Sequence, residues 1–252
     1  MSLYALIGAL EQGAAFGIMV LGVFLTFRVL DFPDLTVDGS LPLGASVSAV
    51  AITHGISPAL SLLLAMAAGF IAGMVTGILN TKLKILHLLA SILTMTALYS
   101  INIRIMGGPN ISLLGSNTLL DLLAPWGLAG YLTAPIIFSV IALCTAVVVI
   151  WFLHTEMGLA MQATGNNPQM ILSQGVNTHG MIILGVGLSN ALVALAGALI
   201  AQNQGFADVQ MGVGMIVMGL AAIIIGEALI SPKTVFRLTL AAVVGSVLYN
   251  FI

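Results

Sequence analysis

Long runs of apolar residues dominate the chain and are separated by short polar stretches. Five of these runs are about 20 residues long or longer, which is the length of a helix that crosses the hydrocarbon core of a bilayer. The pattern predicts an all-α polytopic membrane protein, a single transmembrane domain over residues 1–252, with about seven to eight membrane segments. The long runs lie at about 3–27, 58–79, 85–106, 132–153 and 181–200, and shorter ones at about 43–52, at 215–228 and from 236 onward.

Residues 28–53 depart from this pattern. They begin with three aspartates and continue as an apolar stretch, 43–52, that is too short to cross a bilayer alone. Irregular backbone occurs at membrane depth only where protein buries it or where it lines a cavity. We therefore expect a broken or re-entrant helix that starts at Ser40 or Pro42. Acidic residues at membrane depth are candidates for function, which makes Asp38 and Ser40 candidates for a translocation pathway; the alternative is that the aspartates form the aqueous cap of the preceding segment.

Small residues recur at every fourth position in the segment 58–79. Such a stripe lets two helix backbones approach closely in a membrane. We interpret it as a helix-packing surface, with a glycine-rich gating hinge as the alternative. The stripe is formed by Ala65, Gly69, Gly73 and Gly77.

Several polar residues lie inside the apolar segments. Their side chains can satisfy one another or backbone carbonyls between helices, or they can line a polar path through the membrane. Both interpretations remain open at this point. The further pathway candidates are Thr94, Thr96, Asn102 and Asn190.

The longest polar stretch is 155–179, which reads TEMGLAMQATGNNPQMILSQGVNTH. Its spacing predicts a short helix over 157–164 that stops at Gly165, because glycine accepts the left-handed conformation at a helix end. Asn167 then serves as N-cap and Pro168 as first residue of a second short helix, which Gly175 ends. The two helices would expose apolar side chains on an otherwise polar loop. A solvated connector between two spans is the alternative.

The composition excludes several classes of protein. Charged residues make up 6% of the chain, against about 25% in a typical soluble domain, and the net charge of −2 argues against nucleic acid as a partner. The single cysteine, Cys144, forms neither a disulfide framework nor a cysteine metal site. The histidines share no metal-ligand spacing, no catalytic set is recognisable, and the chain has no Gly-x-x-x-x-Gly-Lys-Ser/Thr loop for ATP. We expect a non-enzymatic membrane protein without a metal or cofactor of its own.

The basic residues predict an orientation. Positively charged residues gather on the cytoplasmic side of membrane proteins. If the broken helix counts as one crossing, five of the six basic residues fall on the same side as the stretch 155–179, which is therefore expected in the cytoplasm. These five are Arg28, Lys82, Lys84, Lys233 and Arg237, and Arg104 falls on the other side.

The stretch from Gly158 through Gly165-Asn166-Asn167-Pro168 to Gly175-Val176 resembles the coupling loop of ATP-binding-cassette (ABC) importer permeases of the branched-chain amino acid/ribose (LivH/RbsC-like) family. In that family the loop docks in a groove of a cytoplasmic ATPase. This chain departs from relatives that carry arginines in the loop, so docking would depend on shape and apolar side chains. The resemblance implies the following ATPase-coupling residues: Met157, Leu159, Ala163, Gly165, Asn167, Pro168, Met170, Leu172 and Gly175.

A second stretch, Asp31-Phe32 through Asp34–Ser40 to Leu43-Gly44-Ala45, resembles one subgroup of these permeases, near proposed tryptophan and tyrosine transporters. The resemblance implies a bacterial inner-membrane permease that moves a small polar solute such as an amino acid, with aromatic amino acids suggested by the subgroup. It also implies three protein partners: an ABC ATPase subunit, which binds the ATP, an extracytoplasmic substrate-binding protein and a second permease copy.

Two other functions agree less well with the sequence. A stand-alone secondary transporter would use carboxylates at mid-membrane for ion coupling and often has inverted repeats. The apolar segments offer only Glu11 and Glu227 for that purpose, and no convincing repeat is visible. A membrane scaffold without transport would not need the capped pair of short helices.

Overall fold

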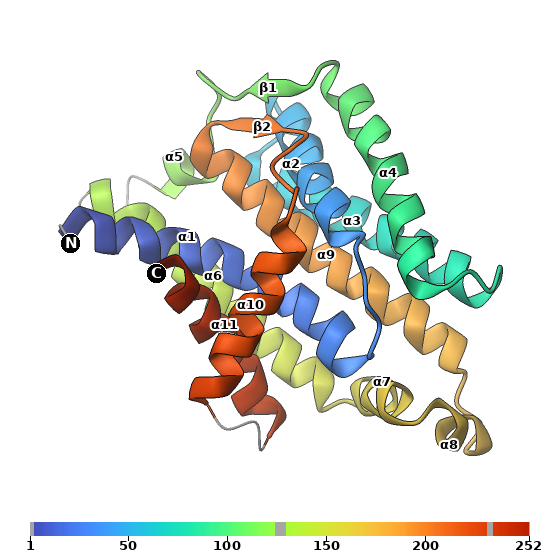
Figure 1. Cartoon of the computed structure of the whole chain (residues 1–252). Coiled ribbons are helices and arrows are strands. Elements are labelled where there is room, and N and C mark those ends of the chain that lie inside the picture. The colour runs from blue at the N-terminus through green and yellow to red at the C-terminus, as the bar shows by residue number, and fades with distance from the viewer. Residues whose placement is uncertain (1–2, 124–129, 231–233, 252) are drawn as a thin grey trace.

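The structure, a computed structural model, describes residues 3–123, 130–230 and 234–251 and is almost entirely helical there (Figure 1). In this part of the chain, five helices are long and apolar enough to cross a membrane. The prediction of an all-α polytopic membrane protein is confirmed. The five are α1 (Leu3–Phe24, continued by a π-helix at Leu25–Val29), α3 (Pro58–Thr81), α4 (His87–Met106), α6 (Gly130–Leu153) and α9 (Thr178–Gln204), and the shorter apolar helices are α2 (Val37–Thr53), α10 (Met215–Leu229) and α11 (Val235–Phe251).

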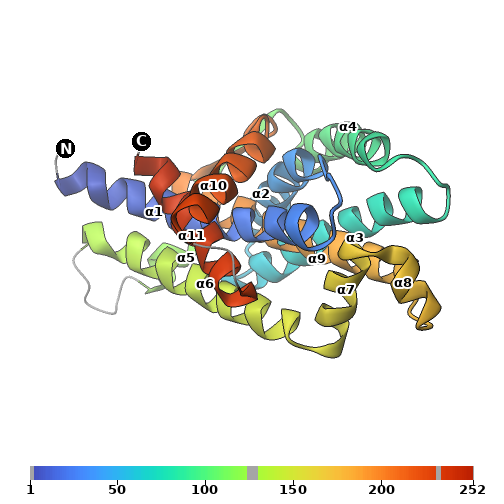
Figure 2. The same ribbon diagram turned by 60° about the horizontal axis from the view of Figure 1, so that its bottom comes forward.

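Helix α9 is the centre of the bundle, with α1, α2 and α3 packed around it (Figures 1 and 2). The glycine stripe of α3 faces α9. A Cβ atom on Gly69 would lie 2.4 Å from the carbonyl oxygen of Asn190, and one on Gly73 would lie 2.4 Å from that of Val186. Only residues without a side chain allow this distance between two helix backbones, so the stripe positions α3 directly on α9.

The predicted break after the first span is confirmed, but the predicted start of the next helix is wrong. Helix α2 begins at Val37, ahead of Ser40 and Pro42, and has 17 residues. The carboxylate of Asp34 accepts the N–H of Thr36 at 2.9 Å, which turns the chain just before the helix. Pro42 is tolerated inside α2 although it leaves the Asp38 carbonyl without an intrahelical donor, and Gly212 packs directly against that carbonyl.

The two ends of the bundle differ. One end carries two short helices, α7 (Glu156–Asn166) and α8 (Pro168–Ser173), and we call it the α7–α8 end (Figure 2). The other carries α5 (Leu119–Leu123) and a two-stranded antiparallel sheet, β1 (Asn110–Ser112) with β2 (Phe206–Asp208), and we call it the strand end (Figure 1).

The sheet was not predicted from the sequence, which indicated a loop over 107–130 and a polar turn over 202–208. Helix α9 instead extends to Gln204, and Gly205 ends it in the left-handed conformation, at φ +75°. The chain then pairs residues 206–208 with 110–112, in the register Ile111 opposite Ala207. These two segments are far apart in the sequence, and no local pattern shows that they meet.

The basic residues follow the predicted asymmetry. Arg28 lies at the end of α1 that approaches α7 and forms an ion pair with Glu227 of α10 at 2.9 Å. Arg104 lies in the last turn of α4, at the strand end.

Lys82 and Lys84 follow the end of α3, where Gly77 packs on Ile183 near the start of α9, the helix that comes after α8. Arg237 lies in α11, between Val235 and Leu238, which line a pocket together with Gln162 and Asn166 of α7. Lys233 lies outside the described residues.

Candidate functional site: a coupling surface and a central cavity

The two short helices of the polar stretch are capped by their own side chains. The hydroxyl of Thr155 accepts the N–H of Gly158 at 3.3 Å, at the start of α7. The side chain of Asn167 accepts the N–H of Met170 at 3.1 Å, at the start of α8. The predicted N-cap at Asn167 and the predicted first helical residue Pro168 are confirmed. Gly175 has φ +84°, as expected for a residue that ends a helix in the left-handed conformation.

The predicted helix stop at Gly165 is wrong. Helix α7 continues through Gly165 to Asn166, and Gly165 is not among the residues with positive φ. This glycine is needed for space: a Cβ atom there would lie 2.1 Å from the carbonyl oxygen of Val29 and 3.0 Å from Leu30. The close approach fastens α7 to the π-helix at the end of α1.

Apolar side chains of α7 and α8 are exposed at the α7–α8 end. The buried side of the two helices is formed by Gly158, Met161, Thr164 and Ile171. Between 155 and 179 the chain has no lysine or arginine. Exposed apolar groups that cluster on a polar loop indicate an interaction surface. We call the following four residues the coupling surface: Met157 (46% exposed), Leu159 (56%), Met170 (56%) and Leu172 (53%).

A buried polar network lies at the middle of the bundle. The amide of Asn190 donates to the carboxylate of Asp34 at 2.7 Å and accepts from the hydroxyl of Ser40 at 2.6 Å. The hydroxyls of Thr36 and Thr76 are 2.9 Å apart. All five side chains are fully buried. Two pathway candidates, Ser40 and Asn190, thus bond to each other inside the packed bundle, and their role in a pathway stays a prediction.

A cavity of about 240 Å³ lies between α2, α4 and the segment before α10, and we call it the central cavity. Three other pathway candidates line it: Asp38, Thr96 and Asn102. Its other lining residues are Gly39, Pro42, Met95, Tyr99, Val209 and Val213.

Asp38 joins two helices at this cavity. It lies in the first turn of α2, and its carboxylate oxygens accept the N–H groups of Gly214 at 3.1 Å and Ile216 at 2.9 Å, at the start of α10. A carboxylate at a helix N-terminus is favoured by the free N–H groups and the helix dipole. The sequence marked Asp38 as acidic and near membrane depth, but nothing local linked it to a helix more than 170 residues away.

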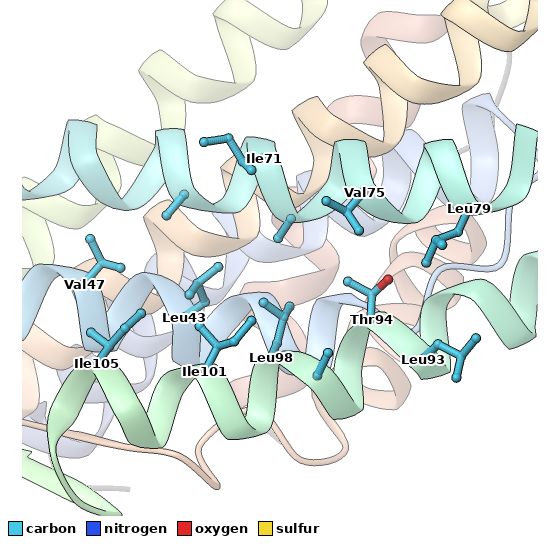
Figure 3. Close-up of a pocket in the computed structure, with 13 residues that line it drawn as sticks. Leu43, Val47, Ile71, Val75, Leu79, Leu93, Thr94, Leu98, Ile101 and Ile105 are labelled. Carbon is cyan, nitrogen blue, oxygen red and sulfur yellow. The ribbon is translucent and has the colours of Figure 1, made fainter. Parts of the chain in front are cut away.

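Thr94 lies in a different environment. It lines a second cavity, of about 520 Å³, between α2, α3 and α4, where the other lining side chains are apolar (Figure 3). Leu79 and Val75 come from α3, and Leu93 and Leu98 from α4 (Figure 3). The hydroxyl of Thr94 donates to the Ala90 carbonyl at 3.0 Å. This hydrogen bond satisfies the hydroxyl within its own helix.

Residues 5–252 match the family model described as "Branched-chain amino acid transport system / permease component". The chain belongs to this family. The permease is therefore a multi-pass membrane protein and a transport component, as the resemblance implied.

Individual relatives agree with this assignment. The permease is 42% identical over 246 residues to a tyrosine transport system permease protein of Clostridioides difficile, covering 98% of this chain and 81% of the relative. It is 28% identical to the galactofuranose transporter permease protein YtfT of Escherichia coli (76% of this chain, 54% of the relative). It is also 28% identical to the ribose import permease protein RbsC of Bacillus subtilis (76% and 58%). No solved structure matches the permease.

Proposed function

We propose that this permease is the membrane subunit of an ABC importer for amino acids, with tyrosine or another aromatic amino acid as the first candidate substrate. The similarity to the tyrosine transport system permease protein supports this substrate class, because it extends over almost the whole of this chain. ATP is bound by a separate cytoplasmic ATPase, and a substrate-binding protein delivers the solute at the strand end.

The coupling surface is the observation that carries the proposal. Four large apolar side chains are exposed on two short, capped helices at the end of the bundle that is rich in basic residues. The positive-inside rule assigns that end to the cytoplasm. Exposure of Leu159 and Met170 to water does not stabilise the permease alone, whereas a groove of a partner protein would bury both side chains.

The contacts of α7 provide a route for force into the membrane. Gly165 lies against the backbone of Val29 and Leu30, and Leu30 and Met161 pack together against Gly185 of α9. A push on α7 therefore reaches the end of α1 and the start of α9 directly. Since close-packed elements shift as rigid bodies, ATP-driven closure of the ATPases would rock these helices.

Two permease copies complete the transporter in this proposal. The central cavity lies beside α4, whose Thr96 and Tyr99 side chains are exposed in the single chain. Polar groups at membrane depth face protein or water rather than lipid. A second copy packed on this side would close the pathway.

The test uses matched aspartate substitutions on α8. The permease would be co-expressed with a candidate ABC ATPase from the same organism. Met170→Asp is the test variant and Gln169→Asp is the control, since both positions are exposed on the same short helix. A carboxylate buried in an apolar contact without a partner costs about 2 kcal/mol or more. We expect Met170→Asp to lower the amount of co-purified ATPase at least about tenfold, and Gln169→Asp to leave it close to the native level.

Uptake of labelled tyrosine into proteoliposomes with the binding protein then tests the substrate. Equal loss in both α8 variants would show that the coupling surface has no specific role. If no ATPase associates with the native permease, the importer assignment fails, and proton- or sodium-driven uptake becomes the next measurement.

A further inference from the structure

We infer that the substrate-binding protein docks on the outer face of the two-stranded sheet, with Leu114 and Phe206 as its apolar contacts. This inference rests on the proposed function, which has the binding protein deliver the solute at the strand end, and it adds the surface and the chemistry of that contact. The outer face consists of Asn110, Ser112 and Leu114, from β1 and the turn after it, and of Phe206 and Asp208, from β2.

The sheet has two unlike faces. Residues directly opposite each other in an antiparallel pair have their side chains on the same side, and successive residues alternate between the two sides. Ile111 and Ala207 are opposite each other and pack into one apolar cluster with residues of α2 and α9. The neighbouring pair of Ser112 and Phe206 therefore points away from the bundle. Phe206 is 47% exposed although it is a large aromatic residue.

The outer face is rigid before any partner arrives. The ladder continues past the strands, because the N–H of Leu113 donates to the Gly205 carbonyl at 2.8 Å, and the Leu113 side chain is buried in the same apolar cluster. A bond from the N–H of Ser116 to the Leu113 carbonyl, at 3.0 Å, closes the turn after β1. This turn presents Leu114, which is 89% exposed. A surface fixed in this way loses little conformational entropy when it binds.

The position of the outer face favours a partner in water. The sheet and the helices α7 and α8 lie at opposite ends of the bundle (Figure 1), so the outer face points out of the membrane in the proposed orientation. Two permease copies in one membrane stand side by side, and their shared surface lies on the flank of each bundle. Lipid chains fit poorly, because Asn110, Ser112 and Asp208 lie on the same face and polar groups are costly in hydrocarbon.

Charge defines the chemistry of the partner. Asp208 lies on the outer face, Asp121 is exposed in α5, and the carboxylate of Glu11 accepts the side-chain amide of Asn203 at the end of α9. Against these, the described part of the strand end carries one guanidinium, that of Arg104. Complementary charges steer two proteins together. The outer face therefore fits a protein that offers an apolar recess surrounded by lysine or arginine side chains.

The two kinds of side chain have different expected effects. A few central residues carry most of the binding energy of an interface, and Leu114 and Phe206 are the large apolar groups of the outer face. Charges at the rim of an interface mainly change the association rate. Loss of an apolar contact should therefore shorten the lifetime of the complex, and loss of a carboxylate should slow its formation.

The first measurement is biolayer interferometry between the permease–ATPase complex in nanodiscs and the binding protein. The binding protein is the candidate from the same organism that supports uptake in proteoliposomes. Leu114→Asp and Phe206→Asp should each weaken binding about tenfold or more, because each places an unpaired carboxylate in an apolar contact. Asp121→Asn should lower the association rate about twofold and leave the dissociation rate close to native. Asn117→Asp is the control, since Asn117 is exposed at the same end and already polar.

A second measurement does not depend on a loss of binding. In the Cys144→Ser background, which removes the native free cysteine, Leu114→Cys would carry a nitroxide spin label. We expect a water-soluble nickel complex to reach the label, and the binding protein to immobilise it. A label reached mainly by oxygen would assign Leu114 to lipid, and dipolar broadening between labels would assign it to a second copy. Either result overturns the inference.

The interferometry has its own contrary outcomes. Unchanged affinity in Leu114→Asp and Phe206→Asp overturns the inference, and so does an equal loss in Asn117→Asp, which would show an effect of added charge alone. In both cases the importer assignment stands, because the native permease still supports uptake. If no binding protein supports uptake by the native permease, the proposed function fails and this inference fails with it.

Discussion

At the scale of single residues, two glycines of the polar stretch serve different purposes. Gly175 has a positive φ, and nothing lies within 4 Å of the place where a Cβ would be. Gly165 has an ordinary helical conformation and no room for a Cβ. The first is required by backbone conformation and the second by the contact between α7 and the end of α1.

Gly165→Ala is therefore expected to destabilise the permease. The added methyl group would meet the Val29 carbonyl at 2.1 Å, which forces α7 and the π-helix apart, and overpacking of this kind costs about 1–3 kcal/mol. Thermal unfolding in detergent, followed by size-exclusion chromatography, measures the effect. Gly180→Ala is the control, because the nearest atom to its added Cβ would be 3.7 Å away. Equal stability of the two variants would show that the close approach at Gly165 does not contribute to stability.

At the scale of elements, α8 depends on its capping residues more than the long membrane helices do. It has six residues. An isolated helix needs about 12–15 residues to be marginally stable in water. The cap at Asn167, the fixed φ of Pro168 and the burial of Ile171 hold it together. Because α8 is so short, each of these three features contributes a large share of its stability.

Asn167→Ala should loosen the whole of α8, because loss of an N-cap costs about 1 kcal/mol. We expect faster hydrogen exchange across residues 168–174 and less co-purified ATPase. Asn177→Ala provides the comparison, since Asn177 caps the 27-residue α9 through the same type of bond, to Gly180 N–H at 3.2 Å. In Asn177→Ala we expect faster hydrogen exchange in the first turn of α9 only. Faster exchange along the whole of α9 would contradict the conclusion that α8 depends unusually strongly on its cap.

At the scale of the whole molecule, Asn190 joins helices that the chain order separates. Its three hydrogen bonds reach Asp34, Ser40 and the Val186 carbonyl, in a region where α2, α3 and α9 meet. Hydrogen bonds between membrane helices contribute about 0.6 kcal/mol on average, but a buried polar group left without a partner costs more. The Asn190 amide is the donor to Oδ2 of Asp34 and the acceptor for the Ser40 hydroxyl, whereas Oδ1 of Asp34 also accepts the Thr36 N–H.

Asn190→Leu should therefore destabilise the permease by about 2 kcal/mol or more, because it leaves Oδ2 of the buried Asp34 carboxyl without its donor and the Ser40 hydroxyl without its acceptor. Ser189→Ala removes a single bond, from the Ser189 hydroxyl to the Gly22 carbonyl at 2.7 Å, and should cost well under half as much. Denaturant unfolding in mixed micelles, monitored by tryptophan fluorescence, compares the two. Similar costs would indicate that Asp34 and Ser40 find other partners.

Features that depend on neighbouring residues were predictable. The lengths of the apolar runs, the Asn167-Pro168 cap and the left-handed Gly175 each follow from spacing or side-chain chemistry within a few positions. The same local signal was ambiguous at Gly165, because a glycine that ends a helix and a glycine that makes room for another backbone look alike in a sequence.

Features that depend on contact between distant segments became visible only in the folded chain. The glycine spacing in α3 showed a packing stripe but not its partner α9, and the aspartates after α1 showed polarity but not that Asp38 caps α10. The division of the pathway candidates into a closed network, an apolar cavity and the central cavity likewise depends on which helix faces which. Hydrophobicity determines that a helix enters the membrane, but it is non-directional and does not select the neighbours of that helix. The neighbours are selected by the fit of helix surfaces and by the pairing of buried polar groups.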